Sequence, residues 1–128
     1  MPNALIKLEL TNCSNLRKIT GLSDLSNLQV LDISQCQNVE ELPSIETLVS
    51  LKELKADGCV KLKSIRGLGQ LKNLRLLNVH ECSGLEGLPG IQHCRSLEYL
   101  DVKGCPKQWA EEGLLEQLLH QQVKVLKM

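Results

Sequence analysis

Aromatic side chains are almost absent from this sequence. Its 128 residues include no phenylalanine, one tryptophan (Trp109) and one tyrosine (Tyr99). Because each buried aromatic ring usually covers ~150–250 Å² of a core, this core must be built from another residue type. The chain has 27 leucines, and few aromatics with many leucines indicate a repeat protein.

An excess of either charge is also missing. Fifteen Lys and Arg balance fifteen Asp and Glu, which excludes a globally basic surface that follows a nucleic-acid backbone. No apolar run approaches the roughly 20 residues that cross a bilayer, and the first residues lack the regions of a secretory signal peptide. We therefore expect no nucleic-acid partner, no membrane partner and a cytoplasmic location.

One unit of 23 residues recurs through most of the chain without insertion or deletion, and its apolar positions align in eight columns. The first column is Leu8, Leu31, Leu54, Leu77 and Leu100. The second is Leu10, Ile33, Ala56, Val79 and Val102. The third is Cys13, Cys36, Cys59, Cys82 and Cys105. Chance does not produce such columns, so the search for repeats decides the fold class.

Each unit combines two periodicities. The L-x-L step at its start has the period of a β-strand, with both leucines on one side. The remainder has an apolar residue at every third position, as in a 3₁₀ path, and Gly21, Pro43, Gly67 and Pro89 interrupt any α-helix. Each unit is therefore a short strand plus an irregular return, and stacked units share one continuous core.

These repeats resemble leucine-rich repeats over roughly residues 5–105. The segments LDISQCQNVEELPSIETLVSL and LNVHECSGLEGLPGIQHCRSL resemble those of plant intracellular immune receptors of the nucleotide-binding, leucine-rich class. F-box proteins of ubiquitin ligases also have a Cys-type repeat, but their repeat is longer than this 23-residue unit, so the period argues against that family. The resemblance implies an α/β repeat fold: a right-handed solenoid of about five units, with short parallel strands on a concave face that binds proteins. These residues contain no nucleotide-binding module, so the receptors' switch is not assigned to them.

The cysteines of the third column are interpreted as small buried thiols that cap the backbone at the end of each strand. Equivalent side chains in a parallel ladder point the same way, which is poor geometry for a disulfide. Their 23-residue spacing does not fit a metal site. Reduced thiols agree with an intracellular protein.

Residues that could carry catalysis have no partners that the sequence identifies. No phosphate-loop, zinc-protease or nucleophile-elbow motif occurs. His80 follows a strand but has no nucleophile to assist, and the pair Glu40 and Glu41 is interpreted as a solvated surface. We therefore expect no enzymatic activity, no cofactor and no metal.

The candidate binding residues lie between the core leucines of each strand and just after it, where side chains face away from the core. These positions vary in charge and size from unit to unit. Val30, Leu76 and Tyr99 are the sharper indication, since exposed apolar and aromatic groups often anchor interfaces. The full predicted partner-binding set is Val30, Leu76, Tyr99, Asp32, Lys55, Asn78, Asp101, Asp57, His80 and Lys103.

The two ends of the solenoid are expected to differ. The period stops after Cys105, so we divide the chain into a solenoid over 1–105 and a C-terminal cap over 106–128. The cap is predicted to contain an amphipathic helix over about 107–121 with Trp109 as its plug, followed by a short extended segment. No cap precedes the first unit: either another copy of the chain covers it, or the chain was cut from something larger.

Two functions remain open on the sequence. The first is a protein-interaction module that binds its partner through the concave face, as the recognition region of a plant-type immune receptor. The alternative is a free-standing leucine-rich-repeat scaffold that self-associates through its uncapped first coil.

Overall fold

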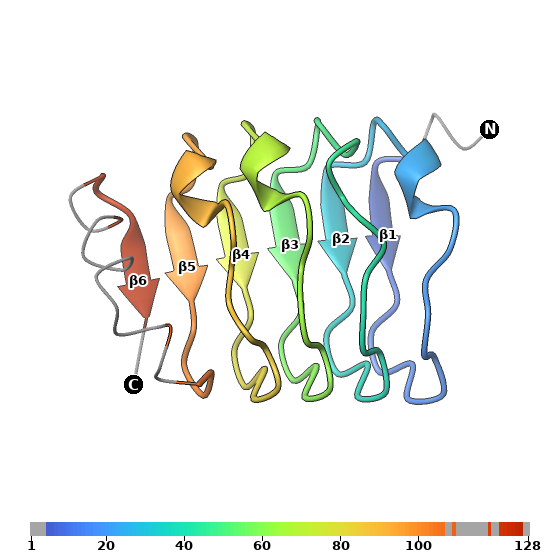
Figure 1. The fold of residues 1–128 in the computed structure, drawn as a ribbon. Helices are drawn as coiled ribbons and strands as arrows, with labels where there is room; N and C mark the ends of the chain where they lie inside the picture. Colours follow the sequence, from blue (N-terminus) through green and yellow to red (C-terminus); the bar gives the residue numbers. More distant parts are fainter. Residues whose placement is uncertain (1–4, 107–108, 110–117, 119–120, 127–128) are drawn as a thin grey trace.

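The computed structural model describes residues 5–106, 109, 118 and 121–126, and it is a parallel solenoid. Its strands form one six-stranded sheet in which sequence order equals spatial order, as Figure 1 shows. The strands are β1 (Lys7–Glu9), β2 (Val30–Asp32), β3 (Glu53–Lys55), β4 (Leu76–Asn78), β5 (Tyr99–Asp101) and β6 (Lys124–Leu126).

The strand register confirms the 23-residue unit. Leu8 pairs with Leu31, and Leu31 with Leu54, so each residue lies beside its equivalent one unit later. The same register continues through β4 and β5. β6 was expected only as a short extended segment, and it adds a sixth parallel strand in which Val125 pairs with Leu100.

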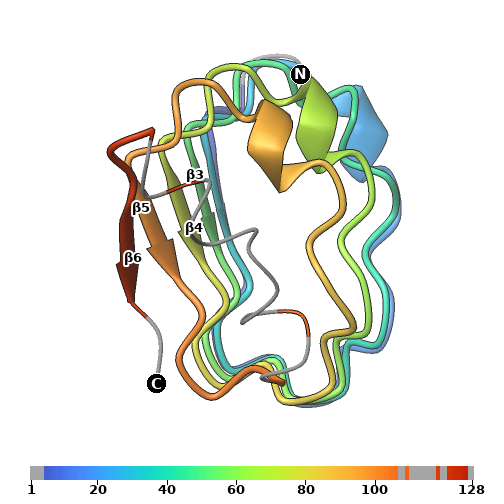
Figure 2. The same ribbon diagram turned by 60° about the vertical axis from the view of Figure 1, so that its left-hand side comes forward.

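The return segments contain short 3₁₀ helices, as the period of three predicts. They are η2 (Leu22–Asp24), η3 (Leu68–Gln70) and η4 (Ile91–His93), and Figure 2 shows them on the far side of the solenoid from the sheet. Each begins after a glycine in the left-handed region: Gly21, Gly67 or Gly90. The second unit has Ser44 at this position and no 3₁₀ helix. The glycine therefore decides whether the return tightens into a 3₁₀ turn.

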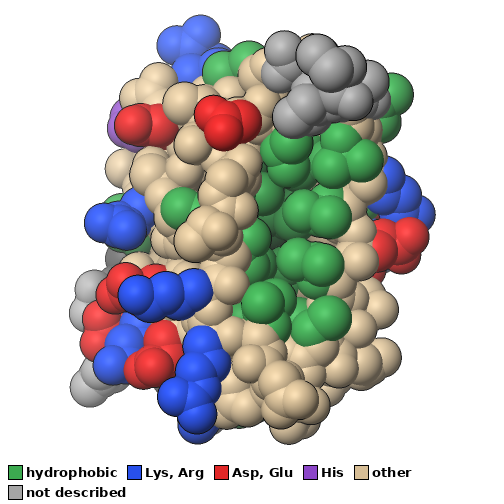
Figure 3. Space-filling model, turned by 90° about the vertical axis from the view of Figure 1, so that its right-hand side faces the viewer, with side chains coloured by type: hydrophobic (Ala, Val, Ile, Leu, Met, Phe, Trp, Pro, Cys, Tyr) green, Lys and Arg blue, Asp and Glu red, His purple; other side chains and the backbone are tan. Residues whose placement is uncertain are grey.

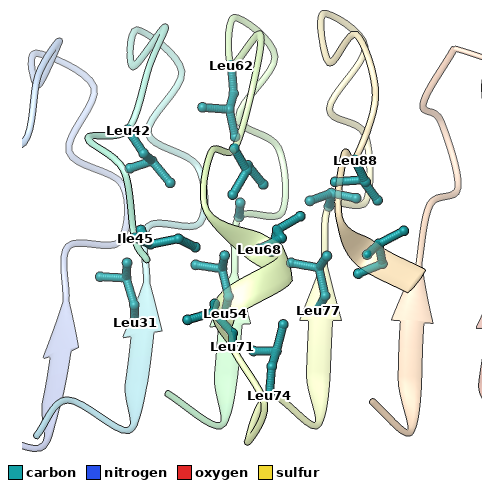
Figure 4. Close-up of a cluster of buried hydrophobic side chains, with 14 of the residues drawn as sticks. Leu31, Leu42, Ile45, Leu54, Leu62, Leu68, Leu71, Leu74, Leu77 and Leu88 are labelled. Atoms are coloured by element: carbon teal, nitrogen blue, oxygen red, sulfur yellow. The ribbon is translucent and has the colours of Figure 1, made fainter. Parts of the chain in front are cut away.

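The core is one continuous column of aliphatic side chains. Leu31, Leu54 and Leu77 point inward from the strands, and residues such as Leu42 and Leu68 point toward them from the returns (Figure 4). These five side chains are at most 1% exposed. Burial of a leucine contributes roughly 1.5–3 kcal/mol, so the stacking of units, rather than any single unit, supplies the stability.

The C-terminal end of this core is covered. Trp109 packs against the core and donates its indole N–H to the carbonyl of Leu85 at 2.9 Å. Leu118 is fully buried, and Val123 is 3% exposed. The predicted capping helix over 107–121 lies almost entirely outside the described residues. Of those described in this range, Trp109 and Leu118 are α-helical and Gln121 lies in a turn, so the rest of that helix stays a prediction.

Candidate functional site on the strand face

The candidate site is the outward side of the sheet, which we call the strand face. In β2 the central Leu31 is fully buried, whereas Val30 and Asp32 on either side are half-buried and face outward. The same alternation holds in β3 and β4. The pleat thus separates core and surface positions as the sequence predicts, and the resemblance predicts that this surface is concave.

The structure brings two of the three predicted apolar anchors together. Leu76 and Tyr99 are direct register partners on β4 and β5, and both are half-buried. Val30 lies apart, because Glu53 of β3 separates it from Leu76. β6 contributes Leu126, which pairs with Asp101 beside Tyr99. We define Leu76, Tyr99 and Leu126 as the apolar cluster. The sequence analysis missed Leu126 because the path of the last residues could not be fixed by the repeat.

Several predicted binding residues also hold the backbone in place. The side-chain oxygen of Asp32 accepts the main-chain N–H of Ser34 at 3.0 Å. Asn78 accepts the N–H of His80 at 2.9 Å. Asp101, which is 6% exposed, accepts the N–H of Lys103 at 3.0 Å. This contact between an Asx side chain and the amide two residues on closes the turn that follows β2, β4 and β5.

Lys55 is different, since it occupies the same column without an Asx oxygen. Its ammonium lies 3.5 Å from the carboxylate of Glu53, and both side chains are about 40% exposed, at 39% and 40%. Ion pairs this exposed contribute little to stability. Lys55 is therefore available to a partner, whereas Asp32, Asn78 and Asp101 are already used by the fold.

His80, Asp57 and Lys103 occupy the column that follows the strands, and all three are half-buried. The imidazole of His80 lies between two carboxylates: Nδ1 is 3.5 Å from Asp101, and Nε2 is 3.5 Å from Glu81. Nδ1 is buried and makes no hydrogen bond with the described residues. The arrangement places a polar edge beside the apolar cluster.

Hydrogen bonds confirm the prediction that the cysteines of the third column cap the backbone. The thiol of Cys59 donates to the carbonyl of Ile33 at 3.1 Å, and that of Cys82 to Ala56 at 3.0 Å. Cys36 and Cys105 make the same contact, always 26 residues back. All six cysteines are free.

Burial also lowers the acidity of these thiols. Desolvation raises the pKa of Cys59 to about 12 and that of Cys105 to about 11. The pKa of Cys82 is raised as well, again chiefly by burial. Because the thiolate is the reactive form, these groups are poor nucleophiles. The buried cysteines of this column therefore stabilise the backbone and are not reactive groups.

Two hollows that the sequence analysis missed lie on the flank between the strands and the 3₁₀ helices. The first, of about 390 Å³, is lined by Arg17, Lys18, Glu40, Glu41 and Lys63. The second, of about 210 Å³, shares Lys18 and Glu41 with it and adds Arg66. Charges of both signs alternate there, and Lys63 forms an exposed ion pair with Glu40 at 3.8 Å. This pair links the second unit to the third.

Within the described part of the chain, no three His, Cys, Asp or Glu side chains are grouped to hold a metal ion. A search of the same residues also finds no helix of the length and apolarity that a membrane span requires.

Comparison with solved structures supports the fold. An internalin (inlF) from Listeria monocytogenes superposes with a TM-score of 0.51 at 14% sequence identity, covering 98% of this chain and 48% of the internalin. A leucine-rich-repeat protein of Leptospira interrogans matches at 19% identity with a TM-score of 0.25, covering 98% of this chain and 55% of its own. The chain thus spans about half the length of each.

No protein-family model matches the sequence, and no curated protein matches it. The internalin match and the register together define a leucine-rich-repeat type of parallel solenoid with about five turns. This fold typically serves protein binding and is usually non-catalytic.

Proposed function

We propose that the chain is a protein-interaction module whose partner docks on the C-terminal half of the strand face. The observation that carries the proposal is the adjacency of Leu76 and Tyr99 on β4 and β5. Both side chains are half-buried, and the Tyr99 hydroxyl makes no hydrogen bond with the described residues. Large apolar and aromatic side chains grouped on a rigid sheet are the usual anchors of an interface.

The polar surroundings favour the same region. Lys124 pairs with Tyr99 across β5 and β6 and is exposed. Lys55 lies on β3, one strand away from Leu76, and Asp57, His80 and Lys103 follow the ends of β3, β4 and β5. An apolar centre with a charged rim is the anatomy of a specific protein interface.

The test is quantitative capture from an extract of the source with three immobilised proteins. The strand-face variant carries Leu76→Ala and Tyr99→Ala, and the control carries Val49→Ala and Val60→Ala, which truncate exposed residues (53% and 41%) that lie outside the six strands. We expect one or more proteins to bind wild type and control equally and the strand-face variant roughly tenfold less. Equal capture by all three proteins would contradict the proposal.

A finer proposal concerns the biological class: we propose that the module acts as the recognition region of a receptor resembling plant intracellular immune receptors. Its support is the L-x-[IV]-x-x-C-x-x-[LV]-x-x-L-P wording of the second and fourth units. The similar solved structures are bacterial, so this proposal rests on the sequence alone. An immunoblot of the source distinguishes the alternatives: a receptor predicts a mass far above 14.3 kDa, and a free-standing scaffold predicts that mass.

We also propose a cytoplasmic location. Four of the five column thiols donate to a carbonyl of the preceding unit, and oxidation to a disulfide would remove that donor. A reducing compartment preserves these contacts. Fractionation that finds the protein in a secreted fraction would contradict this proposal.

A further inference from the structure

The N-terminal end of the solenoid exposes the side chains that form the core in every later unit. Five residues of the first unit are partly exposed: Leu8, Leu10, Cys13, Leu16 and Leu25. Their equivalents one unit later are all 0% exposed: Leu31, Ile33, Cys36, Val39 and Leu48. Figure 3 shows the resulting band of apolar side chains across this end of the molecule. We call these five residues the end face.

Among the described strands, β1 pairs on one side only, with β2. The main-chain N–H of Leu10 donates to the carbonyl of Asp32 on β2. Alternate residues of a strand direct their N–H and C=O groups to the same side, so those of Leu8 and Leu10 point toward β2. Lys7 and Glu9 then direct theirs toward the open edge. The thiol of Cys13 donates to the carbonyl of Thr11 in its own turn at 3.8 Å, whereas the column thiols of the later units donate to the unit before them. An apolar end with an open strand edge is a template for another strand.

We propose that this end face pairs with the end face of a second copy of the chain, with β1 antiparallel to β1 and Leu8 opposite Leu8. In this register, Lys7 of one copy lies opposite Glu9 of the second copy, and each such pair exchanges both of its main-chain hydrogen bonds. The apolar end faces meet behind the joined sheet. This proposal does not depend on the strand-face function proposed above.

The charges of Lys7 and Glu9 favour this register over the other antiparallel pairings of β1 with its own copy. Centring the pairing on Lys7 places two lysines opposite each other, and centring it on Glu9 places two glutamates opposite each other. A shift by a single residue would set core-facing against outward-facing positions. The register centred on Leu8 therefore combines matched faces with opposite charges, and directly opposed like charges in a sheet are destabilising.

Charge also disfavours head-to-tail stacking, the other way to cover this end. Continuing the parallel ladder from β6 to β1 of a second copy would repeat the register in which Tyr99 pairs with Lys124. Lys124 would then lie opposite Lys7, and Leu126 opposite Glu9. The N-terminal edge thus fits its own copy better than it fits the C-terminal edge.

Complementary charge variants test the proposal by sedimentation velocity of the full chain. Wild type should form a particle of twice the 14.3 kDa chain mass. Glu9→Lys alone and Lys7→Glu alone each place like charges opposite one another, and the dimer dissociation constant should rise on the order of tenfold or more. Mixing the two variants restores both opposite-charge pairs, so the equimolar mixture should return to the dimer.

The matched controls are Glu53→Lys and Lys55→Glu. They alter the ion pair between Lys55 and Glu53 on β3, in the interior of the sheet, which corresponds to the pair between Lys7 and Glu9 on β1. They should leave the dimer unchanged, and circular dichroism of every variant checks folding. Three outcomes would overturn the proposal: a wild-type monomer at all concentrations, which would leave the end face to a different partner; open filaments, which would indicate head-to-tail stacking; or a dimer that the Glu9 and Lys7 variants do not weaken.

Discussion

At the scale of single residues, the turn after each strand shows how the repeat enforces one backbone shape with different side chains. All five residues that begin this turn have positive φ: Asn12, Gln35, Gly58, Glu81 and Gly104. Their φ values run from 61° to 81°. Only two are glycine, so the others adopt a conformation that costs an L-residue roughly 1–2 kcal/mol. The stack imposes this shape on whatever side chain the column contains.

Glu81→Gly should therefore stabilise the protein. Relief of the left-handed strain outweighs the greater freedom of glycine in the unfolded chain, and we expect a gain of about 0.5–1 kcal/mol in the free energy of unfolding. The matched control is Glu86→Gly, which removes the same charge at an exposed position without positive φ and should destabilise. Urea denaturation measures both; a loss of stability in Glu81→Gly contradicts the argument.

Cys94 allows a test of the buried thiols, because its column contains leucine in the earlier units: Leu25, Leu48 and Leu71. Burial raises the pKa of Cys94 to about 11. Above about pH 9 the unfolded chain loses the thiol proton while the folded chain keeps it, so stability falls as pH rises toward 11.

Cys94→Leu removes this contribution and should make the loss of stability shallower. One thiol accounts for at most ~1.4 kcal/mol per pH unit in this window. The carbonyl of Leu68, which accepts the Cys94 thiol at 3.1 Å, also accepts the N–H of Leu71, so it stays paired in the variant. Urea midpoints measured under reducing conditions between about pH 8 and about pH 11 give the comparison. Parallel curves for the two proteins would show that the thiol is not responsible.

At the scale of elements, a glycine decides whether a return segment forms a 3₁₀ helix. Gly67 precedes η3 with φ at 94°, and a Cβ added there would lie 2.6 Å from the main-chain nitrogen of Glu46 in the preceding unit. Gly21 precedes η2 with φ at 75°, but a Cβ there meets nothing within 4 Å. The two positions share the backbone requirement and differ in the contact with a neighbouring unit.

Gly67→Ala should accordingly cost more than Gly21→Ala. We expect about 1 kcal/mol for Gly21→Ala from backbone strain, and roughly 1–3 kcal/mol more for Gly67→Ala from the clash with the preceding unit. Thermal unfolding of both variants measures the difference. Equal losses would mean that the units are not packed as closely as the contact distance indicates.

The sequence predicts these elements to different extents. The strands and their register follow from the leucine and cysteine columns, because a one-residue slip would turn Leu31 and its equivalents to the outside. The Asx contacts of Asp32, Asn78 and Asp101 do not follow, since polar residues at surface positions read equally well as binding residues. The place of Leu126 opposite Asp101 depends on the path of β6, which lies beyond the repeat and so was not predicted by its period.

At the scale of the whole molecule, the solenoid presents two surfaces with different chemistry. The strand face gathers Leu76, Tyr99 and Leu126 on its C-terminal half, whereas the end face exposes the core of the first unit. Because β1 lies at the far edge of the sheet from β5 and β6, pairing through the end face would leave the apolar cluster free. The Lys7 and Glu9 charge variants and the Leu76 and Tyr99 truncations should then act independently, as distant sites usually do.

Photo-crosslinking is the sharpest test of whether the strand face is the surface that contacts a partner. A photoreactive phenylalanine analogue replaces Tyr99 in one protein and Val49, exposed outside the six strands, in another. After irradiation in an extract of the source, we expect a covalent adduct to a second protein from position 99 and none from position 49. An adduct from position 49 without one from position 99 would contradict the claim.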